Sequence, residues 1–575
     1  MIKEEFFKKR ISYIMGFFIL VSLIIFARLF VIQIIDHNIY ASEASFENTF
    51  KQNIPSLRGV ITASNSTILA DNKPIYHLYV NLKNIQNKNK LVSSISSVLN
   101  IPKSNILKTL NNNNLVWVKL SNSVSASQKS KLSTFPSLIF VRHEGRYYPN
   151  NDLFAHILGF VGKDKYGNTS GFYGIEGYFN GSLSGHSGYS SGVESALGVP
   201  LLNKNYTFVP PSNGDLINLT INPAIQKDAS TQLDMWAKKL DATSGAVIIM
   251  NPKTGAIIAM SSYPTFNPNQ YWKYQYGSYV NNAISFIYEP GSVGKIIMVA
   301  GALNSGKVTP QTTVDDSTGV FLANGKKIYN WNKLPAGVMN LGRILYLSSN
   351  VGASIIATKY LSSQIMYNTS KAFGFGSLLG ITLQGEETGI IPPYQTWDKA
   401  ALATDSFGQY VSVSPLQIID AYDVVANGGK RMQPYIVNSI TMPNGKTVSY
   451  KPTVIDQPVT STIAKEMIPM FTYATQGEPN WALHQTGVAQ YMPIIASKTG
   501  SAQMPSTKHP GQYSKSNYVM TYVGFAPNNN PKFIMLTMLN SPHKPLLNQY
   551  YAATTACVLW GAISNYLFKY YNIAP

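Results

Sequence analysis

Apolar residues form one continuous run near the start of the chain and become periodic only later. The run "ISYIMGFFILVSLIIFARLFVIQII" (11–35) contains a single charged residue, Arg28, and about 20 apolar residues suffice for a helix to cross a bilayer. Three basic residues precede the run at 8–10, and Asp36 follows it. The basic flank predicts a cytoplasmic N-terminus, with everything after Asp36 outside the cytoplasm.

The same run is open to a second interpretation, a cleavable signal peptide. The sequence "SEA" (42–44) is a passable cleavage site. The apolar run is longer than the roughly 7–15 residues of a signal-peptide core, which favours an uncleaved anchor. We therefore expect a cytoplasmic tail at 1–10 and one transmembrane helix at 11–35.

Residues 36–220 show only short β-like runs, such as "IYHLYV" (75–80) and "LVWVKL" (115–120), among many Asn, Ser and Gly residues. This pattern predicts an extended, mixed α/β region rather than one dense core. A boundary is expected within "PPSNGDLINLTINPAIQ" (210–226), where a Pro/Gly turn leads into an alternating strand and then a helix.

Beyond this boundary the pattern of apolar and polar residues predicts individual strands and helices more clearly. The runs "GAVIIM" (245–250) and "AIIAMSSY" (256–263) flank the turn "NPKTG" and predict a β-hairpin, after which a mostly helical stretch follows. Three further strands and a closing amphipathic helix are predicted at 493–503, 518–527, 532–539 and 551–571. Two strands, a helical insert, three strands and a final helix indicate an α+β fold over 221–575.

Composition narrows the class of protein. A chain of 575 residues with 45% hydrophobic residues is expected to form two or three globular domains. Cys557 is the single cysteine, so no intrachain disulfide can form, which fits the cytosol and equally an exported protein without disulfides. The net charge of +19 comes from lysines scattered through segments such as 81–90. This distribution favours a solvated surface attracted to anionic membrane or wall, and we expect no nucleic-acid partner.

Candidate chemistry begins with "EPGSVGK" (289–295), in which a lysine precedes the apolar run "IIMVAGAL". A helix that starts near Pro290 would place Ser292 and Lys295 side by side, because residues at i and i+3 share one face. An amine among apolar residues is poorly solvated, which favours its neutral form. The pair therefore predicts a nucleophile beside a general base, although Ser-x-x-Lys alone also arises by chance.

Two further elements give this pair a context. Ser348-x-Asn350 stands at the start of another helical pattern, and Lys498-Thr499-Gly500 lies on a predicted strand. Together, the three elements are the known signature of penicillin-binding proteins and β-lactamases. Second copies exist in "SPHK" (541–544), which no apolar helix follows, and "PKTG" (252–255), which we interpret as a hairpin turn.

The chain resembles class B penicillin-binding proteins from its apolar run to its end. Similar segments are "SLRGVITASNSTILA" (56–70), "RYYPNNDLFAHILGFVG" (146–162), "GIEGYFNGSLSGHSG" (174–188), 244–269, 406–429 and "YLFKYYNIAP" (566–575). The resemblance implies a pedestal of the dimerisation type at 36–220. It also implies a transpeptidase domain at 221–575, with an antiparallel five-stranded sheet, helices on both faces and a helical subdomain.

The implied activity is that of a peptidoglycan D,D-transpeptidase, which cross-links stem peptides ending in D-Ala-D-Ala and uses no metal or organic cofactor. Carried over motif by motif, Ser292 attacks the D-Ala-D-Ala carbonyl and Lys295 takes its proton. Ser348 relays a proton to the leaving D-Ala, and Asn350 holds the substrate amide. β-Lactam antibiotics are the expected inhibitors.

The third element supplies the implied substrate-binding strand. Lys498 adds positive field, and Thr499, Gly500 and Ser501 bind the substrate, with the two hydroxyls on its terminal carboxylate. Backbone N–H groups of Ser292 and Ser501 would form the oxyanion hole.

The sequence also departs from the family pattern. Val293 and Gly294 stand where Thr and a bulkier residue are usual, and a glycine inside a helix costs about 1 kcal/mol relative to alanine, so a less rigid backbone at Lys295 is expected. The turn "ASNS" (63–66) replaces an Asp-Arg-Asn-Gly turn, and Ser501 replaces a more common Thr.

Several alternatives remain open. A membrane-anchored serine β-lactamase shares the three elements, and a noncatalytic β-lactam-binding scaffold keeps them without activity. A β-lactam sensor would need further spans or an intracellular domain, and a bifunctional enzyme would need a glycosyltransferase domain. Glycan polymerisation is therefore expected from a partner membrane polymerase. "SFGQ" (406–409) favours a division-type over an elongation-type member and its partner proteins.

Overall fold

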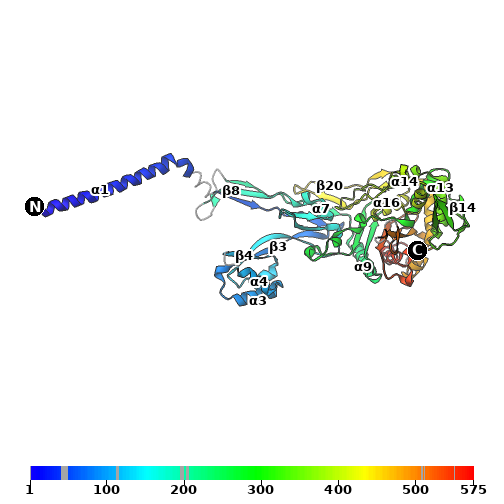
Figure 1. Ribbon diagram of the computed structural model, residues 1–575, viewed down its shortest axis with the longest axis horizontal. Helices are drawn as coiled ribbons and strands as arrows, with labels where there is room; N and C mark the ends of the chain where they lie inside the picture. Colours follow the sequence, from blue (N-terminus) through cyan, green and yellow to red (C-terminus); the bar gives the residue numbers. More distant parts are fainter. Residues whose placement is uncertain are drawn as a thin grey trace. The chain divides into compact units, whose positions relative to one another are not determined.

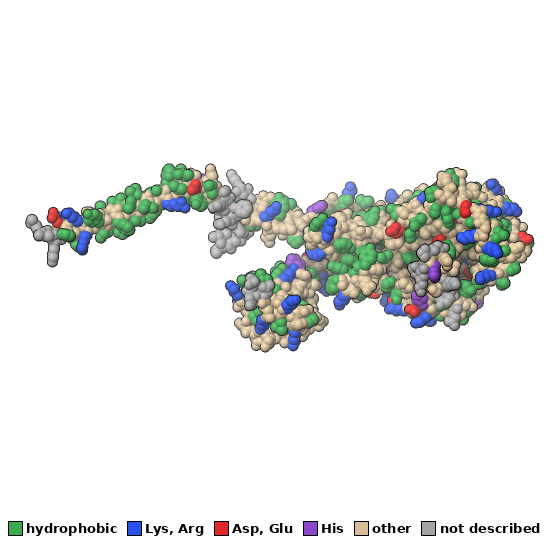
Figure 2. All heavy atoms as spheres, viewed as in Figure 1, with side chains coloured by type: hydrophobic (Ala, Val, Ile, Leu, Met, Phe, Trp, Pro, Cys, Tyr) green, Lys and Arg blue, Asp and Glu red, His purple; other side chains and the backbone are tan. Residues whose placement is uncertain are grey.

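The computed structural model describes residues 2–40, 49–111, 115–194, 200–201, 206–506, 509, 512–549 and 551–575. Helix α1 (Ile2–Phe30) continues into the π-helical segment η1 (Val31–Ile35). Within these described ranges, residues 5–35 are the one helical stretch long and apolar enough to span a membrane. Hydrophobic side chains cover most of its visible surface, with basic ones near its start (Figure 2). The alternative cleavage sequence at 42–44 lies outside the described residues.

The chain divides into two compact units, of which the first combines residues 1–57 with 185–213. Besides α1, this unit contains a small antiparallel sheet in which β1 (Thr49–Ile54) and β10 (Thr207–Val209) flank β8 (Gly188–Glu194). A short strand, β9 (Pro200–Leu201), also pairs with β8. The second unit comprises residues 58–184 and 214–575 and holds everything described below.

A seven-stranded sheet forms the pedestal of the second unit. Its order is β20-β19-β11-β2-β3-β4, and β5 also pairs with β3, along Asp71–Val80. These strands are β2 (Ile61–Thr62), β3 (Ile68–Asn81), β4 (Trp117–Val124), β5 (Leu138–Tyr147), β11 (Leu216–Leu219), β19 (Val437–Thr441) and β20 (Thr447–Ser449). Two of them, β19 and β20, come from beyond the boundary expected near residue 220, and that boundary remains a prediction.

One end of the pedestal is a small α/β subdomain. Helices α3 (Lys88–Leu99), α4 (Lys103–Leu110) and α5 (Ala126–Leu132) pack on β3, β4 and β5, and the group is seen together in Figure 1. Its core is separate from the others and includes Leu78, Val80 and Ile95. The remaining pedestal elements are η2 (Leu82–Asn84), α6 (Ala155–Leu158), β6 (Phe160–Lys163), β7 (Thr169–Phe172), α7 (Gly174–Tyr178) and α8 (Asn180–Ser184).

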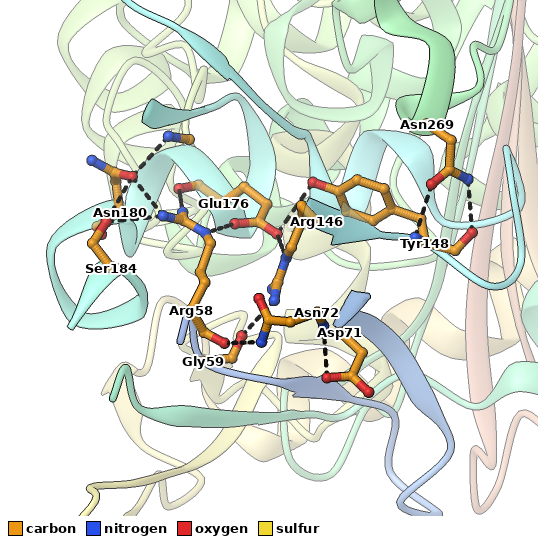
Figure 3. A network of polar contacts seen from close by, with 11 residues as sticks. Arg58, Gly59, Asp71, Asn72, Arg146, Tyr148, Glu176, Asn180, Ser184 and Asn269 are labelled. Atoms are coloured by element: carbon orange, nitrogen blue, oxygen red, sulfur yellow. Dashed lines mark hydrogen bonds and ion pairs between the residues drawn. The ribbon is translucent and has the colours of Figure 1, made fainter. Parts of the chain in front are cut away.

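A buried ionic network ties the pedestal segments together (Figure 3). The carboxylate of Glu176, which is fully buried, accepts hydrogen bonds from Arg58 Nε and Arg146 Nε, each at 2.6 Å. Tyr148 donates to the same carboxylate at 3.3 Å, and Arg58 also reaches Asn180 at 3.0 Å. Buried charges need such partners, because an unpaired one is strongly destabilising.

The transpeptidase region is built on a five-stranded antiparallel sheet of order β13-β12-β24-β23-β22. Its strands are β12 (Ser244–Met250), β13 (Ile257–Tyr263), β22 (Ala496–Pro505), β23 (Tyr513–Ala526) and β24 (Phe533–Asn540). All the strands predicted from the sequence in this region form, and both predicted hairpins pair as expected. The α+β fold is confirmed.

Helices cover both faces of this sheet, which explains why β12 and β24 are apolar at most positions. Along β12, Ala246, Ile248 and Met250 face a core shared with α11 (Lys295–Asn304) and α16 (Pro415–Ala426). Val247 and Ile249 face a second core, formed with α9 (Pro223–Lys239) and α19 (Ala556–Tyr570). Asn222 caps α9 and Pro223 occupies its first turn, so the helix begins where the sequence predicts.

The helical subdomain between β13 and β22 also contains small hairpins that the sequence pattern did not predict. These are β14 (Thr313–Asp316) with β17 (Gly337–Asn340), and β15 (Val320–Ala323) with β16 (Lys326–Tyr329). Strands β18 (Arg431–Met432) and β21 (Val454–Asp456) form a third pair. The other elements of the region are η3 (Pro268–Lys273), η4 (Tyr276–Tyr279), α10 (Asn282–Ser285), α12 (Leu341–Leu347), α13 (Asn350–Tyr360), α14 (Ser363–Ala372), η6 (Tyr394–Thr396), α15 (Lys399–Asp405), α17 (Ser461–Thr475), α18 (Asn480–Gln485), η7 (Ala489–Ile494), η8 (Leu546–Asn548) and η9 (Ala552–Thr554).

Candidate active site

The serine of "EPGSVGK" lies in a tight turn that leads into a buried helix. The turn is the 3-10 segment η5 (Gly291–Gly294), and α11 (Lys295–Asn304) follows it directly. Gly291 has a φ of 60°, which glycine adopts without strain. Lys295 Nζ lies 2.7 Å from Ser292 Oγ, so the two residues expected to be neighbours are in contact.

Ser348 and Asn350 approach the same lysine from the junction of α12 and α13. Ser348 ends α12 in the left-handed conformation, with a φ of 54°, and Asn350 begins α13. Lys295 Nζ donates to the Ser348 carbonyl at 3.1 Å and to Asn350 Oδ1 at 2.9 Å. The Asn350 amide nitrogen donates to the Tyr329 carbonyl at 3.3 Å, which orients the side chain.

Strand β22 forms the opposite wall of the site. Lys498 Nζ donates to Ser348 Oγ at 3.0 Å and to Thr499 Oγ1 at 3.0 Å. Ser501 is exposed, and its Oγ accepts a hydrogen bond from the Ala552 amide at 2.9 Å. Between them, Gly500 leaves room for the nucleophile turn, because a Cβ there would lie 2.9 Å from the carbonyl oxygen of Pro290.

All eight candidate residues therefore meet at one place. A cleft is lined by Ser292, Ser348, Asn350, Thr499 and Ser501. The two lysines lie buried beneath it, Lys295 with no exposed surface and Lys498 with 2%. Three segments that are distant in the sequence supply these side chains, as the three-element signature requires.

Burial lowers the pKa of both amines, and the lowering is larger for Lys295. Burial lowers the pKa of Lys295 well below its usual range, and the nearby Lys498 charge lowers it further, while Glu478 acts in the opposite direction. Burial also lowers the pKa of Lys498, again opposed by Glu478. The expectation of a neutral amine beside the serine agrees with these shifts.

The second copies of the motifs are not assembled into sites. Ser541 Oγ bonds Asn540 Oδ1 at 3.0 Å, whereas Lys544 is mostly exposed and lies 3.6 Å from Asp241. Lys253 is exposed in the turn between β12 and β13. The hairpin interpretation of "PKTG" (252–255) is therefore confirmed.

Gly294, which departs from the family pattern, fits a close backbone approach. A Cβ at Gly294 would lie 3.0 Å from Gly408 Cα and 3.1 Å from Pro290 Cγ. Gly408 in turn has a φ of 78°, and its carbonyl accepts a hydrogen bond from the Gly291 amide at 2.9 Å. The space that a larger side chain would need is thus filled by Gly408 and Pro290. The backbone before Lys295 is therefore closely packed, contrary to the expectation that Gly294 makes it less rigid.

Several cleft residues were not predicted from the sequence. Glu478 lies in the turn between α17 and α18, and Thr499 Oγ1 donates a hydrogen bond to its carboxylate. Trp331 and Tyr551 pack edge to face at the rim, with ring centroids 5.1 Å apart. Phe407 and Gln409 also line the cleft, and they belong to the segment "SFGQ" (406–409).

Comparison with known families agrees with this geometry. Residues 245–558 match the penicillin-binding protein transpeptidase domain, and residues 53–219 match the penicillin-binding protein dimerisation domain. The chain belongs to the class B penicillin-binding proteins. It is accordingly an acyltransferase of the transpeptidase type, and residues 53–219 and 245–558 are its two family domains.

Individual members of this class are similar over most of their length. Stage V sporulation protein D of Bacillus subtilis is 28% identical over 547 residues, which cover 93% of this chain and 82% of the relative. The probable peptidoglycan D,D-transpeptidase PbpC of Pseudomonas aeruginosa is 27% identical, covering 93% and 90%. Penicillin-binding protein 2X of Streptococcus thermophilus shares the fold, with a TM-score of 0.70 at 22% identity, covering 91% and 80%.

Proposed function

We propose that this penicillin-binding protein is a peptidoglycan D,D-transpeptidase that works through an acyl-enzyme on Ser292. The observation that carries this proposal is the environment of Lys295 Nζ. A neutral amine has two N–H bonds and one lone pair. The Ser348 carbonyl and Asn350 Oδ1 accept the two N–H bonds, so the lone pair is left for the Ser292 hydroxyl 2.7 Å away.

Acylation follows from this arrangement. Ser292 Oγ attacks the carbonyl of the penultimate D-Ala while its proton passes to Lys295 Nζ. Ser348 then relays a proton, giving its own to the leaving D-Ala nitrogen and taking one from Lys498 Nζ, which donates to its Oγ at 3.0 Å. Because Ser348 Oγ already accepts from Lys498, its own O–H is available as a donor. The amine of a second stem peptide attacks the acyl-enzyme, and the same proton path runs in reverse.

Binding of the donor peptide is assigned to β22 and its neighbours. The hydroxyls of Thr499 and Ser501 lie at the cleft and hold the terminal carboxylate, with positive field from Lys498. Backbone N–H groups of Ser292 and Ser501 stabilise the oxyanion, which is typically the largest electrostatic contribution to such reactions. Asn350 lies where it can hold the substrate amide.

The N-terminal helix is proposed to anchor the enzyme with its N-terminus in the cytoplasm and the catalytic domain outside. The basic residues before the apolar run support this orientation. A reporter fused after residue 60 is expected to be active only outside the cytoplasm, and the mature protein is expected to keep its N-terminus. Recovery of protein that begins near residue 45 would instead identify a signal peptide.

We further assign the enzyme to septal wall synthesis beside a membrane glycan polymerase, with an elongation role as the alternative. The segment "SFGQ" (406–409), which lines the cleft through Phe407 and Gln409, supports this assignment. Depletion of the protein is expected to give filamentous cells. Spherical cells would indicate the elongation role.

The reaction is tested by trapping its intermediate with a β-lactam, which resembles D-Ala-D-Ala and keeps its leaving group tethered after ring opening. The full-length protein in detergent is incubated with benzylpenicillin and followed by intact-mass spectrometry. A long-lived adduct on the Ser292 peptide is expected, and Ser292→Ala is expected to abolish it. Rapid turnover of the drug would favour a β-lactamase, and labelling at Ser541 would show that the other Ser-x-x-Lys is the site.

A further inference from the structure

A carboxylate lies inside the cleft at the place where the substrate carboxylate is expected. Glu478 lines the same cleft as Ser292 and Thr499, and its Oε2 accepts a hydrogen bond from Thr499 Oγ1. It stands in the turn between α17 and α18, and its side chain is partly exposed. Its charge acts on both buried lysines.

The hydroxyl of Thr499 is fully engaged by this contact. A threonine hydroxyl has one proton to donate. Thr499 Oγ1 accepts from Lys498 Nζ at 3.0 Å and gives its proton to Glu478. The carboxylate of a ligand cannot take the same proton while Glu478 holds it, because ionised carboxylates only accept hydrogen bonds. Two carboxylates beside one hydroxyl would also repel each other.

We propose that Glu478 determines specificity by competing with the ligand carboxylate for Thr499. A donor peptide or β-lactam that carries a carboxylate must displace the Glu478 side chain before Thr499 can bind it. A ligand without that charge does not have to. This inference rests on the proposed function, since it assumes that ligands place their carboxylate at Thr499.

Two probes isolate this effect, namely benzylpenicillin and its methyl ester, which lacks the carboxylate. Their second-order acylation rate constants are measured by intact-mass spectrometry on the full-length protein in detergent. The variants are Glu478→Ala and Glu478→Gln, the second of which keeps the size and removes the charge. Glu466→Gln is the matched control, because Glu466 is an exposed residue of the preceding helix, α17, and loses the same charge.

The deciding quantity is the ratio of the acid rate constant to the ester rate constant. We expect Glu478→Ala to raise this ratio by at least about tenfold, with Glu478→Gln between it and wild type and Glu466→Gln unchanged. A ratio in Glu478→Ala within about twofold of wild type, or lower, overturns the inference. If thermal melting shows that Glu478→Ala does not fold, Glu478→Gln is judged by the same criterion.

Adduct lifetime provides a second decision. If Glu478 instead activated water, its removal would lengthen the lifetime of the adduct and leave the ratio unchanged, which contradicts the proposal. Failure of the proposed function is distinguishable, because wild-type protein would then form no adduct on Ser292 with either probe. Labelling of wild type with an unchanged ratio in the variants rejects only the role of Glu478.

Discussion

The described residues include two groups of buried cationic side chains that use different residue types. In the pedestal, Arg58 and Arg146 both contact the Glu176 carboxylate at 2.6 Å. At the cleft, the hydrogen-bond partners of Lys295 and Lys498 are hydroxyl, carbonyl and amide groups. Arginine keeps its proton in proteins, whereas lysine releases its proton readily when buried.

The difference separates a structural group from a reactive one. A permanently charged guanidinium needs a carboxylate in contact, and the resulting network joins three pedestal segments. A lysine held by neutral partners is destabilised in its charged form, so it becomes a base. A buried basic side chain therefore indicates a catalytic role only where the side chain can lose its proton.

Replacing Lys295 with arginine breaks this distinction and has the largest expected effect. The variant has a long side chain and a permanent positive charge, so it cannot supply a lone pair. Acylation by benzylpenicillin is expected to fall by about 10²- to 10⁴-fold, the usual contribution of a general base. The acylation rate is measured by intact-mass spectrometry, and thermal melting checks that the variant folds.

Lys253→Ala is the control for this experiment, because Lys253 belongs to the second Lys-Thr-Gly copy and is exposed. Its acylation rate is expected to stay within about twofold of wild type, since exposed lysines contribute little. Acylation by Lys295→Arg at close to the wild-type rate would remove Lys295 from the role of base.

Glu176→Gln breaks the pedestal network and is expected to lower stability while leaving the cleft residues in place. Two buried arginines lose their carboxylate, which typically costs about 3–5 kcal/mol. Urea unfolding of the full-length protein measures the loss. The control is Glu144→Gln, because the Arg142–Glu144 pair is exposed and is worth under about 1 kcal/mol. Equal losses in the two variants would show that the buried pair has no special role.

The smallest expected effect is on the pH dependence of stability. Because the pKa of Lys295 is lowered in the folded state, the unfolded chain binds more protons between that lowered value and the ordinary lysine value of about 10.4. Wild-type stability therefore gains a positive slope with pH across this window. Lys295→Met removes that contribution.

Unfolding of the two proteins at pH 7 and pH 9.5 tests this consequence. The stability of Lys295→Met relative to wild type is expected to decrease as the pH rises. The acylation rate of wild type depends on the same amine. It is expected to decrease as the pH falls through the lowered pKa of Lys295, because the neutral amine is then lost. A stability difference that is constant with pH would show that Lys295 binds its proton equally in both states.

The sheet of the transpeptidase region could be predicted because each of its strands carries a strong local pattern. A turn with glycine connects β12 and β13, and both faces of the sheet are buried, so β12 and β24 are apolar at most positions. The small hairpins β14–β17 and β15–β16 were missed because they are four residues long and partly exposed, which leaves no clear alternation.

The residues of the candidate site likewise fall into those that a local sequence pattern predicts and those that only the fold brings together. Ser292 and Lys295 are placed by helix spacing, and the other two motifs by their order and their predicted elements. Glu478 could not be predicted, because it reaches the cleft from a turn and belongs to none of the three motifs. Arg58, Arg146 and Glu176 each lie in a segment that resembled the family, yet only the fold brings their side chains together.

The pairing of β11 with β19 has a consequence for how the chain is made. Asn218 and Asn438 are hydrogen-bonded at 2.9 Å although 220 residues separate them. At about 5–20 residues per second, β11 waits roughly 10–40 s for its neighbour to be synthesised. During that interval one side of β11 presents unpaired backbone groups, which are prone to join other chains. A nascent chain halted before residue 437 therefore has an unpaired strand edge at β11, which can pair with other chains.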